Sequence, residues 1–258
     1  MINILLSLLI LLSGFISAQT TGRSIMERVD QIKMPKDTQS QIKMTLISNK
    51  GAKKRTRSRV LTSIEKLYED GKFHSKSLLL FIEPKEVRGT AFLNWDRIGG
   101  EVDDQWLYLP ALKKVRRIRA TDKSRSFQGS DFSYEDLSGR ELDSDRYELI
   151  GEDFFNGTQC YKVKAVPLEK DTQYSSRIIW VDKKYFLIKK IEFFDKKNNI
   201  FKILNIPDHV KNGNYWTAVK MTMHNVIRSH STELEVLKVN YDQGLNDNIF
   251  SESYLKRQ

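Results

Sequence analysis

Hydrophobic and polar residues alternate with a period of two along most of the chain from residue 39 onward. Ile42, Met44 and Leu46, for example, alternate with polar neighbours, as in a β-strand with one buried face. Pairs such as Asn156-Gly157, which adopt tight turns readily, separate many of these runs. The pattern predicts strands at 39–48, 53–62, 72–82, 90–95, 105–109, 113–119, 146–154, 159–167, 175–182, 187–195, 200–206, 217–228 and 232–241.

One segment before these strands has the period of a helix. Ile25, Val29 and Ile32 follow one another at helical spacing, and Ser24 is placed to cap the first turn. We therefore expect a helix over 24–34, with its apolar stripe turned toward the sheet.

The short connections predict that consecutive strands pair as antiparallel neighbours. A sheet with so many strands must curl strongly or close on itself, and a curled sheet has a concave face that must be filled. The predicted fold is therefore mainly β, a single curved antiparallel sheet with few helices. The helix at 24–34, the segment 120–145 and a ligand are candidates to fill the concave face, and the tail 247–258 is expected to form a short final turn or strand.

The stretch 89–137 combines strand-like pieces, TAFLNW and QWLYLP, with aromatic residues. QWLYLP is apolar on both strand faces, so both faces are covered by protein or one face is turned to a hydrophobic ligand. Ordinary core packing is the alternative for each aromatic residue. The candidate lipid-contacting residues are Leu78, Leu80, Leu93, Trp95, Trp106, Tyr108, Phe127, Phe132 and Tyr134.

A dense basic run follows QWLYLP in the same stretch. Long cationic side chains beside an apolar surface suit an amphiphile with an anionic head, or an acidic partner protein. A solvated strand face is the alternative interpretation. The candidate headgroup or partner surface consists of Lys113, Lys114, Arg116, Arg117 and Arg119.

The N-terminus predicts export. Residues 2–17 form an uncharged apolar run that ends in small residues at Ser17-Ala18, which is typical of a cleaved secretory signal over 1–18. The run has no preceding Lys or Arg, so an uncleaved anchor is the alternative. No cysteine lies near the boundary to accept a lipid. The remaining chain, 19–258, contains no linker-like segment and is expected to form one domain.

The formal net charge of +10 raises the question of a polyanionic partner. In an exported protein, the abundant polyanions are lipid headgroups and acidic proteins, so we expect no nucleic acid. A role of the charge in solubility alone is the alternative.

No pattern of catalytic or metal-ligating residues is present in the sequence. The four histidines are scattered without metal-like spacing, and Ser130 lacks the strand-to-helix setting of a nucleophile elbow. We therefore expect neither an enzyme nor a bound metal or cofactor.

Three segments carry a resemblance to a known family. RGTAFLNW at 88–95, DDQWLYLPALKKVRRI at 103–118 and SFQGSDFSYEDL at 126–137 resemble, in order and spacing, the LolA-like family of outer-membrane lipoprotein-sorting proteins. The similarity is greatest to the branch with the TP-0789 domain. Gln128 stands where that branch is expected to have methionine.

The resemblance implies an incomplete antiparallel β-barrel, closed by a few short helices, whose cavity accepts acyl chains of lipoproteins or another lipid. It further implies a periplasmic, monomeric carrier without covalent chemistry. Such a carrier receives its cargo from an inner-membrane transporter and releases it at an outer-membrane acceptor. The rival function is a periplasmic sensor or adaptor that partners a lipid-exporting transporter or a regulatory protein.

Overall fold

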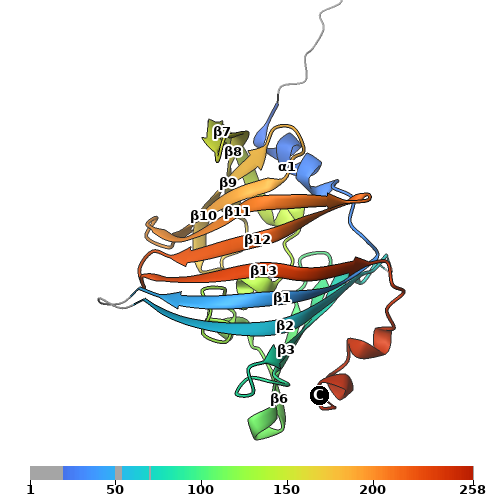
Figure 1. Cartoon of the computed structure of the whole chain (residues 1–258). Coiled ribbons are helices and arrows are strands. Elements are labelled where there is room, and N and C mark those ends of the chain that lie inside the picture. Colours follow the sequence, from blue (N-terminus) through green and yellow to red (C-terminus); the bar gives the residue numbers. More distant parts are fainter. Residues whose placement is uncertain (1–19, 50–53, 70, 258) are drawn as a thin grey trace, which may run out of the picture.

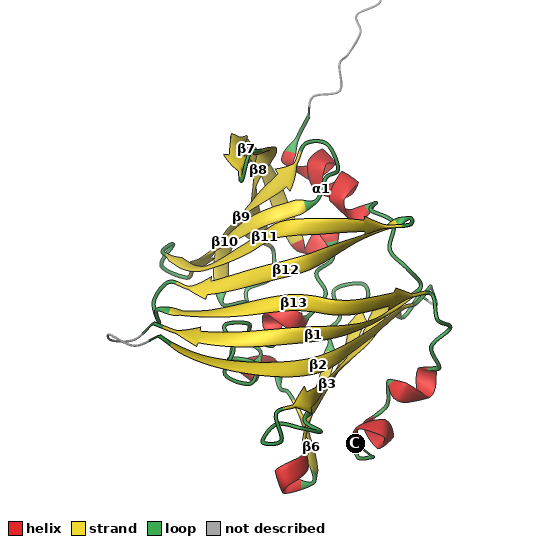
Figure 2. Cartoon of the chain, in the orientation of Figure 1, coloured by secondary structure: helices red, strands yellow, loops and turns green. Residues whose placement is uncertain are grey.

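Thirteen antiparallel strands form one strongly curved sheet (Figures 1 and 2). The computed structural model describes residues 20–49, 54–69 and 71–257. The expected export signal at 1–18 lies outside these residues. Consecutive strands are neighbours in the sheet, except for β6 and β7, which lie at its opposite edges. The first and last strands, β1 and β13, also pair, so the strand order is β6-β5-β4-β3-β2-β1-β13-β12-β11-β10-β9-β8-β7.

The strands lie close to their predicted positions. Their bounds are β1 (Asp37–Ser48), β2 (Arg55–Leu67), β3 (Phe73–Glu83), β4 (Ala91–Arg97), β5 (Asp104–Leu109), β6 (Lys114–Arg117), β7 (Asp145–Phe155), β8 (Thr158–Pro167), β9 (Tyr174–Asp182), β10 (Ile188–Asp195), β11 (Ile200–Asn212), β12 (Tyr215–Asn225) and β13 (His230–Tyr241). The β7–β8 hairpin turns at Asn156 and Gly157, both with positive φ, as the sequence predicts.

The helical elements are few and short. They are α1 (Gly22–Asp30) and α2 (Glu252–Leu255), with single 3₁₀ turns η1 (Pro110–Leu112), η2 (Ala120–Asp122), η3 (Glu135–Leu137), η4 (Leu142–Ser144) and η5 (Asp247–Ile249). The expectation of a mainly β fold, with one curved sheet and few helices, is confirmed.

The sheet does not close, because β6 and β7 form its two edges. The chain between these edges, residues 118–144, runs behind the sheet in the view of Figure 1 and fills part of its concave side. We call it the internal segment. The internal segment packs inside the curled sheet, and this explains why the edge strands β6 and β7 do not pair with each other.

Helix α1 covers the other end of the concave side. Ile25 and Met26 pack against Val163, Ile179 and Val181 of the sheet with Val29 beside them, so the first part of the predicted apolar stripe is confirmed. The predicted end at 34 is wrong, because the helix ends at Asp30 and Ile32 lies beyond it. The predicted start is wrong by two residues, because the helix begins at Gly22 and the cap is Thr21 rather than Ser24. Ser24 instead closes a capping box with Thr21, so it lies at the third helical position.

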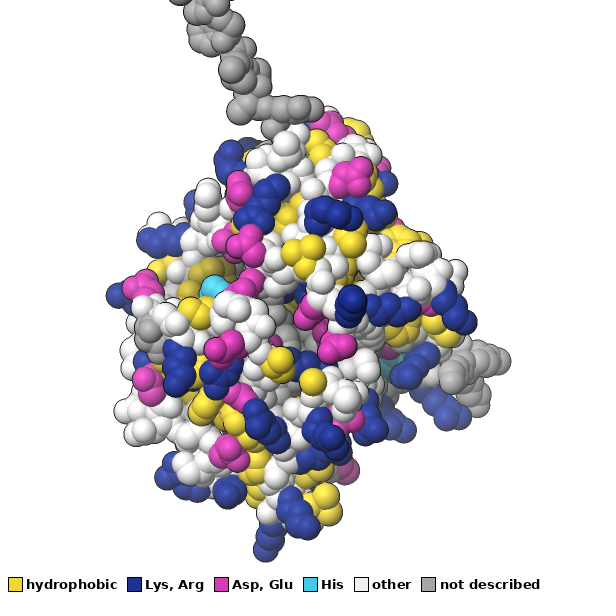
Figure 3. Space-filling model, turned by 180° about the vertical axis from the view of Figure 1, so that it is seen from behind, with side chains coloured by type: hydrophobic (Ala, Val, Ile, Leu, Met, Phe, Trp, Pro, Cys, Tyr) yellow, Lys and Arg dark blue, Asp and Glu magenta, His cyan; other side chains and the backbone are white. Residues whose placement is uncertain are grey.

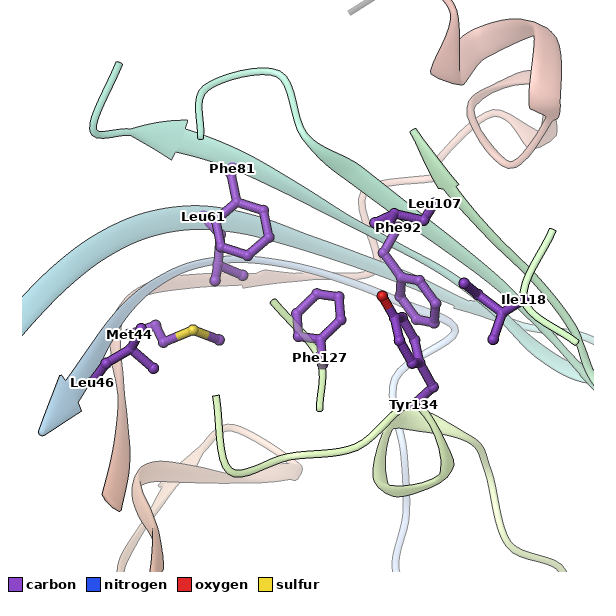
Figure 4. Close-up of a cluster of buried hydrophobic side chains, with 9 residues drawn as sticks. All are labelled: Met44, Leu46, Leu61, Phe81, Phe92, Leu107, Ile118, Phe127 and Tyr134. Atoms are coloured by element: carbon purple, nitrogen blue, oxygen red, sulfur yellow. The ribbon is translucent and has the colours of Figure 1, made fainter. Parts of the chain in front are cut away.

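Strands β3 to β5 are covered on both faces. On the concave face, Phe81, Phe92 and Leu107 surround Phe127 and Tyr134 of the internal segment (Figure 4). The opposite face packs against Phe250 and Leu255 of the C-terminal segment, which forms the expected final turn. This double cover is why QWLYLP is apolar at successive positions.

Candidate functional site

A cavity of about 740 Å³ remains in the half of the concave side that the internal segment does not fill. Its walls are α1, the start of β7, the β8–β9 loop, the inner face of β9 to β12, the β4–β5 hairpin and parts of the internal segment. Figure 3 views this side of the molecule and shows a hollow with acidic side chains around it. The volume lies within the range of about 300–1,000 Å³ typical of sites for one small ligand.

The deep wall of the cavity is apolar. Ile188, Ile191 and Phe193 all face it from β10, although their spacing does not follow strict alternation. A register shift between Ile188 and Lys190, where β10 pairs with β9, accounts for this arrangement. Side chains from other elements complete the wall, among them Met26, Val29, Phe132, Ile179, Leu204 and Met223.

The remaining lining is strongly acidic. Ten carboxylates and five cations line the cavity, a formal net charge of −5 in a chain whose total is +10. The solvent-exposed carboxylates are Asp30, Glu101, Glu169 and Asp171. The site therefore combines an apolar floor with an acidic rim, which is the opposite of the basic rim that the sequence suggested.

A partly buried ionic network joins the internal segment to the sheet at this rim. Arg140 donates to both oxygens of Asp145, from Nε over 2.6 Å and from Nη2 over 2.7 Å. Burial disfavours the charge of Arg140, but the hydrogen bonds from Arg140 to Asp145 and Glu169 outweigh it and raise its pKa. The network fixes the point where the internal segment meets β7.

Asp96, at the end of β4, is a buried carboxylate in the cavity wall. It packs against Gly139, where a side chain would collide with the carboxylate. Burial, and then repulsion from Asp103, raises the pKa of Asp96 from 3.8 to about 7. The folded protein therefore holds a proton that the unfolded chain releases between these two pH values, so this group makes the protein less stable as the pH rises through that window.

We expect Asp96→Asn to raise the free energy of unfolding at pH 8 and to leave it nearly unchanged at pH 4. Urea titrations across pH 4–8 measure this difference. Asp195→Asn is the matched control and should lower the free energy of unfolding at pH 8, because hydrogen bonds from the backbone of Asn199 and then Lys197 lower the pKa of Asp195. An Asp96→Asn variant with a pH-independent difference would contradict the burial of this charge.

The structure places only one of the nine predicted lipid-contacting residues in the cavity lining, namely Phe132. Phe127 and Tyr134 are buried in the core of the internal segment. The other six lie on the opposite face of β3 to β5, in or against the cluster under the C-terminal segment. They are Leu78, Leu80, Leu93, Trp95, Trp106 and Tyr108. Lipid contact is therefore retained as a proposal for Phe132.

Gln128 also lies outside the cavity lining. It has a positive φ of 50° in a turn of the internal segment, and its carbonyl oxygen accepts a hydrogen bond of 2.6 Å from Arg59. A polar side chain at this position is therefore compatible with an apolar cavity elsewhere.

The predicted basic surface lies at the β6 edge of the sheet and not at the cavity. Lys113, Lys114, Arg116, Arg117 and Arg119 are all exposed, and this end of the molecule is rich in Lys and Arg (Figure 3). Arg116 pairs with Asp122 over 2.9 Å, and Arg117 pairs with Asp104. Charged side chains on an edge strand also discourage pairing with another chain.

The described residues contain no group of three His, Cys, Asp or Glu side chains arranged to hold a metal ion. None of the helices in the described ranges is both long and apolar enough to cross a membrane.

Known proteins share both the sequence family and the fold of this chain. A family model described as "uncharacterized protein" matches residues 74–257. A domain from Vibrio parahaemolyticus, described as an outer membrane lipoprotein-sorting protein, is 34% identical, with a TM-score of 0.85 over 92% of this chain and 98% of its own. A DUF1329 family protein from Desulfovibrio piger is also 34% identical, with a TM-score of 0.85 over 91% of this chain and 97% of its own.

A LolA superfamily protein from Nitrosomonas europaea shares the fold at 17% identity, with a TM-score of 0.69 over 92% of this chain and 100% of its own. No curated protein matches the chain. The fold is that of the LolA-like class of proteins. The chain belongs to the LolA-like family of outer-membrane lipoprotein-sorting proteins, and the DUF1329 family protein is among its relatives.

Proposed function

We propose that this protein is an exported, non-enzymatic carrier that binds the acyl chains of a lipoprotein or another lipid in its internal cavity. The observation that carries the proposal is the apolar wall formed by residues such as Ile179, Ile191 and Met223 within a cavity of about 740 Å³. Each methylene buried there contributes about 0.8 kcal/mol. A carrier must also release its cargo, so its affinity for the cargo must remain moderate. Partial burial of the acyl chains therefore suits transfer better than full enclosure.

Family membership supports the same proposal, because the related domain from Vibrio parahaemolyticus is described as a lipoprotein-sorting protein. We infer a periplasmic location, a monomeric state, an inner-membrane transporter as donor and an outer-membrane acceptor. The rival, a sensor or adaptor for a transporter or regulatory protein, predicts a stable complex instead of transfer. Pulldown followed by lipid analysis separates the two functions.

The first test is extraction of the natively purified protein with organic solvent, followed by mass spectrometry. A stoichiometric acyl lipid or lipoprotein is the expected result. A folded protein that is empty, and that refuses added acyl ligands after delipidation, would overturn the carrier proposal.

A bulky residue in the apolar wall is expected to block the cavity. Ile191→Trp should weaken binding of an acyl ligand about tenfold or more, because the indole occupies space that the ligand needs. Ile200→Trp is the matched control, since Ile200 is 39% exposed and lies outside the cavity lining. Titration of delipidated protein with a fluorescent acyl probe measures both variants. Equal affinities would place the ligand elsewhere.

The basic β6 surface remains a proposal for contact with an acidic partner or membrane. Lys113, Lys114 and Arg119 have no ion pair within the described part of the chain, so their charges are available to a partner. We expect Lys113→Gln/Lys114→Gln to weaken attachment to vesicles containing anionic lipid and to leave acyl-probe binding unchanged. Vesicle co-sedimentation measures the first quantity. Unchanged attachment would assign these charges to solubility alone.

A further inference from the structure

The cavity wall contains one buried cation, Arg177, on the inner face of β9. It lies two residues from Ile179, so both side chains point to the same side of the strand, and both line the cavity. The side chain of Arg177 is 8% exposed. Its guanidinium carbon lies 4.9 Å from the ring centre of Tyr174 and 5.9 Å from that of Phe193.

The guanidinium of Arg177 has charge partners but lacks good hydrogen-bond acceptors. Nη2 is 3.6 Å from Glu135 and Nη1 is 3.7 Å from Asp145, both too far for a hydrogen bond. Nη1 is buried with no acceptor in the described structure. A buried donor without an acceptor is costly, so a rotation of the guanidinium that brings Nη1 to an acceptor on a ligand in the cavity would lower the free energy.

The two nearby carboxylates already have other partners. Asp145 accepts both hydrogen bonds from Arg140, as described above, and Glu135 accepts from Thr172 and from the backbone of Gln173. Burial, and then repulsion from Arg140, lowers the pKa of Arg177. Arg177 is thus held by general electrostatic attraction, and its donors are not used up by these side chains.

The charge around Arg177 argues against an anionic ligand. Glu135 and Asp145 already compensate Arg177 electrostatically, and the lining as a whole carries ten carboxylates against five cations. A further carboxylate or phosphate would be repelled by the acidic rim. An uncharged carbonyl oxygen, by contrast, accepts a hydrogen bond from the guanidinium without adding negative charge.

We propose that the cavity selects acyl esters and amides whose polar heads carry no net negative charge, with Arg177 donating to the acyl carbonyl. The acyl chain lies on the apolar wall, and the head points to the acidic rim, where a neutral or cationic group is favoured. This inference rests on the proposed carrier function and specifies its ligand class.

Three probes with the same acyl chain test it on the delipidated protein at pH 8: monopalmitoylglycerol, palmitoylcholine and palmitate. The neutral and cationic esters are expected to bind about tenfold or more tightly than palmitate. Added salt should improve palmitate binding, because it screens repulsion, and should weaken palmitoylcholine binding.

Two variants divide the carbonyl contact from the charge of the rim. Arg177→Met should weaken the binding of monopalmitoylglycerol about tenfold, as expected for a lost hydrogen bond to a charged group. Glu101→Gln, at an exposed rim position, should increase the affinity for palmitate relative to the affinity for monopalmitoylglycerol. The second variant keeps the test decisive if removal of the buried cation prevents folding.

The outcomes are distinguishable. Equal affinities for the three probes, or tighter binding of palmitate, would overturn this inference and leave the carrier function standing. Failure of all three probes to bind would overturn both proposals. Ester selectivity that persists in Arg177→Met would remove Arg177 from the recognition of the carbonyl.

Discussion

Phe127→Ala is expected to lower the free energy of unfolding by about 3–5 kcal/mol, because it removes a fully buried aromatic side chain and leaves a cavity. Phe127 is 0% exposed, and its ring centre lies 5.9 Å from Phe81, 5.3 Å from Phe92 and 5.7 Å from Tyr134 (Figure 4). These contacts join the internal segment to the concave face of β3 and β4. Urea unfolding, followed by far-UV circular dichroism, measures the loss.

Phe154→Ala is the matched control for this prediction. Phe154 lies on β7 and is 65% exposed, so its truncation should change stability by no more than about 0.5 kcal/mol. A loss below about 1 kcal/mol for Phe127→Ala would mean that the internal segment is not packed as a core. The cavity described above would then extend through the whole concave side.

The sequence predicts the strands of this fold well, because alternation and turn chemistry are local properties. All thirteen predicted strands overlap observed ones, from 39–48 in β1 (Asp37–Ser48) to 232–241 in β13 (His230–Tyr241). The shift at the start of α1 has a local cause as well. Thr21 and Ser24 are both good capping residues, and the helix uses them together in one capping box.

The faces of β3 to β5 could not be assigned from the sequence. Phe92 and Leu93 are neighbours of similar hydrophobicity on opposite faces, and both are buried. Alternation reveals a buried face only when the other face is polar, and here the C-terminal segment covers the second face. The contact between Trp95 and the carbonyl of Phe250, over 3.0 Å, joins residues far apart in the chain that no local pattern connects.

A cavity was expected, but its lining residues could not be predicted, because they come from elements far apart in the chain, among them α1, β9 to β12 and the internal segment. One local signal was present. Arg177 shares a strand face with Ile179 and Val181, so an arginine occupies a position where alternation predicts an apolar side chain. A charge on an inward face is more informative than the exposed basic run at β6, because burial requires a partner or a function.

Lys202→Met is also expected to lower the free energy of unfolding by about 3–5 kcal/mol, because it leaves a buried carboxylate without its cationic partner. The side chains of Lys202 and Asp136 are 4% and 6% exposed, and Nζ donates to Asp136 over 2.8 Å. Nζ also lies 3.1 Å from the hydroxyl of Tyr174, which itself donates to Asp136 over 2.6 Å. The triad ties the internal segment to β9 and β11 beside the cavity.

A double-mutant cycle separates the ionic contact from simple loss of packing. Lys202→Met/Asp136→Leu should be less destabilised than the sum of its single variants, because no unpaired charge remains in the interior. The pair of half-buried Lys183 and exposed Glu152, at 2.6 Å, is the control, and Lys183→Met should cost about 1 kcal/mol or less. Additive losses in the cycle would show that Asp136 does not depend on Lys202. A large coupling energy between Lys202 and Asp136 would instead mean that charges within the protein hold this part of the cavity wall in place, so that a bound ligand need not supply a charge.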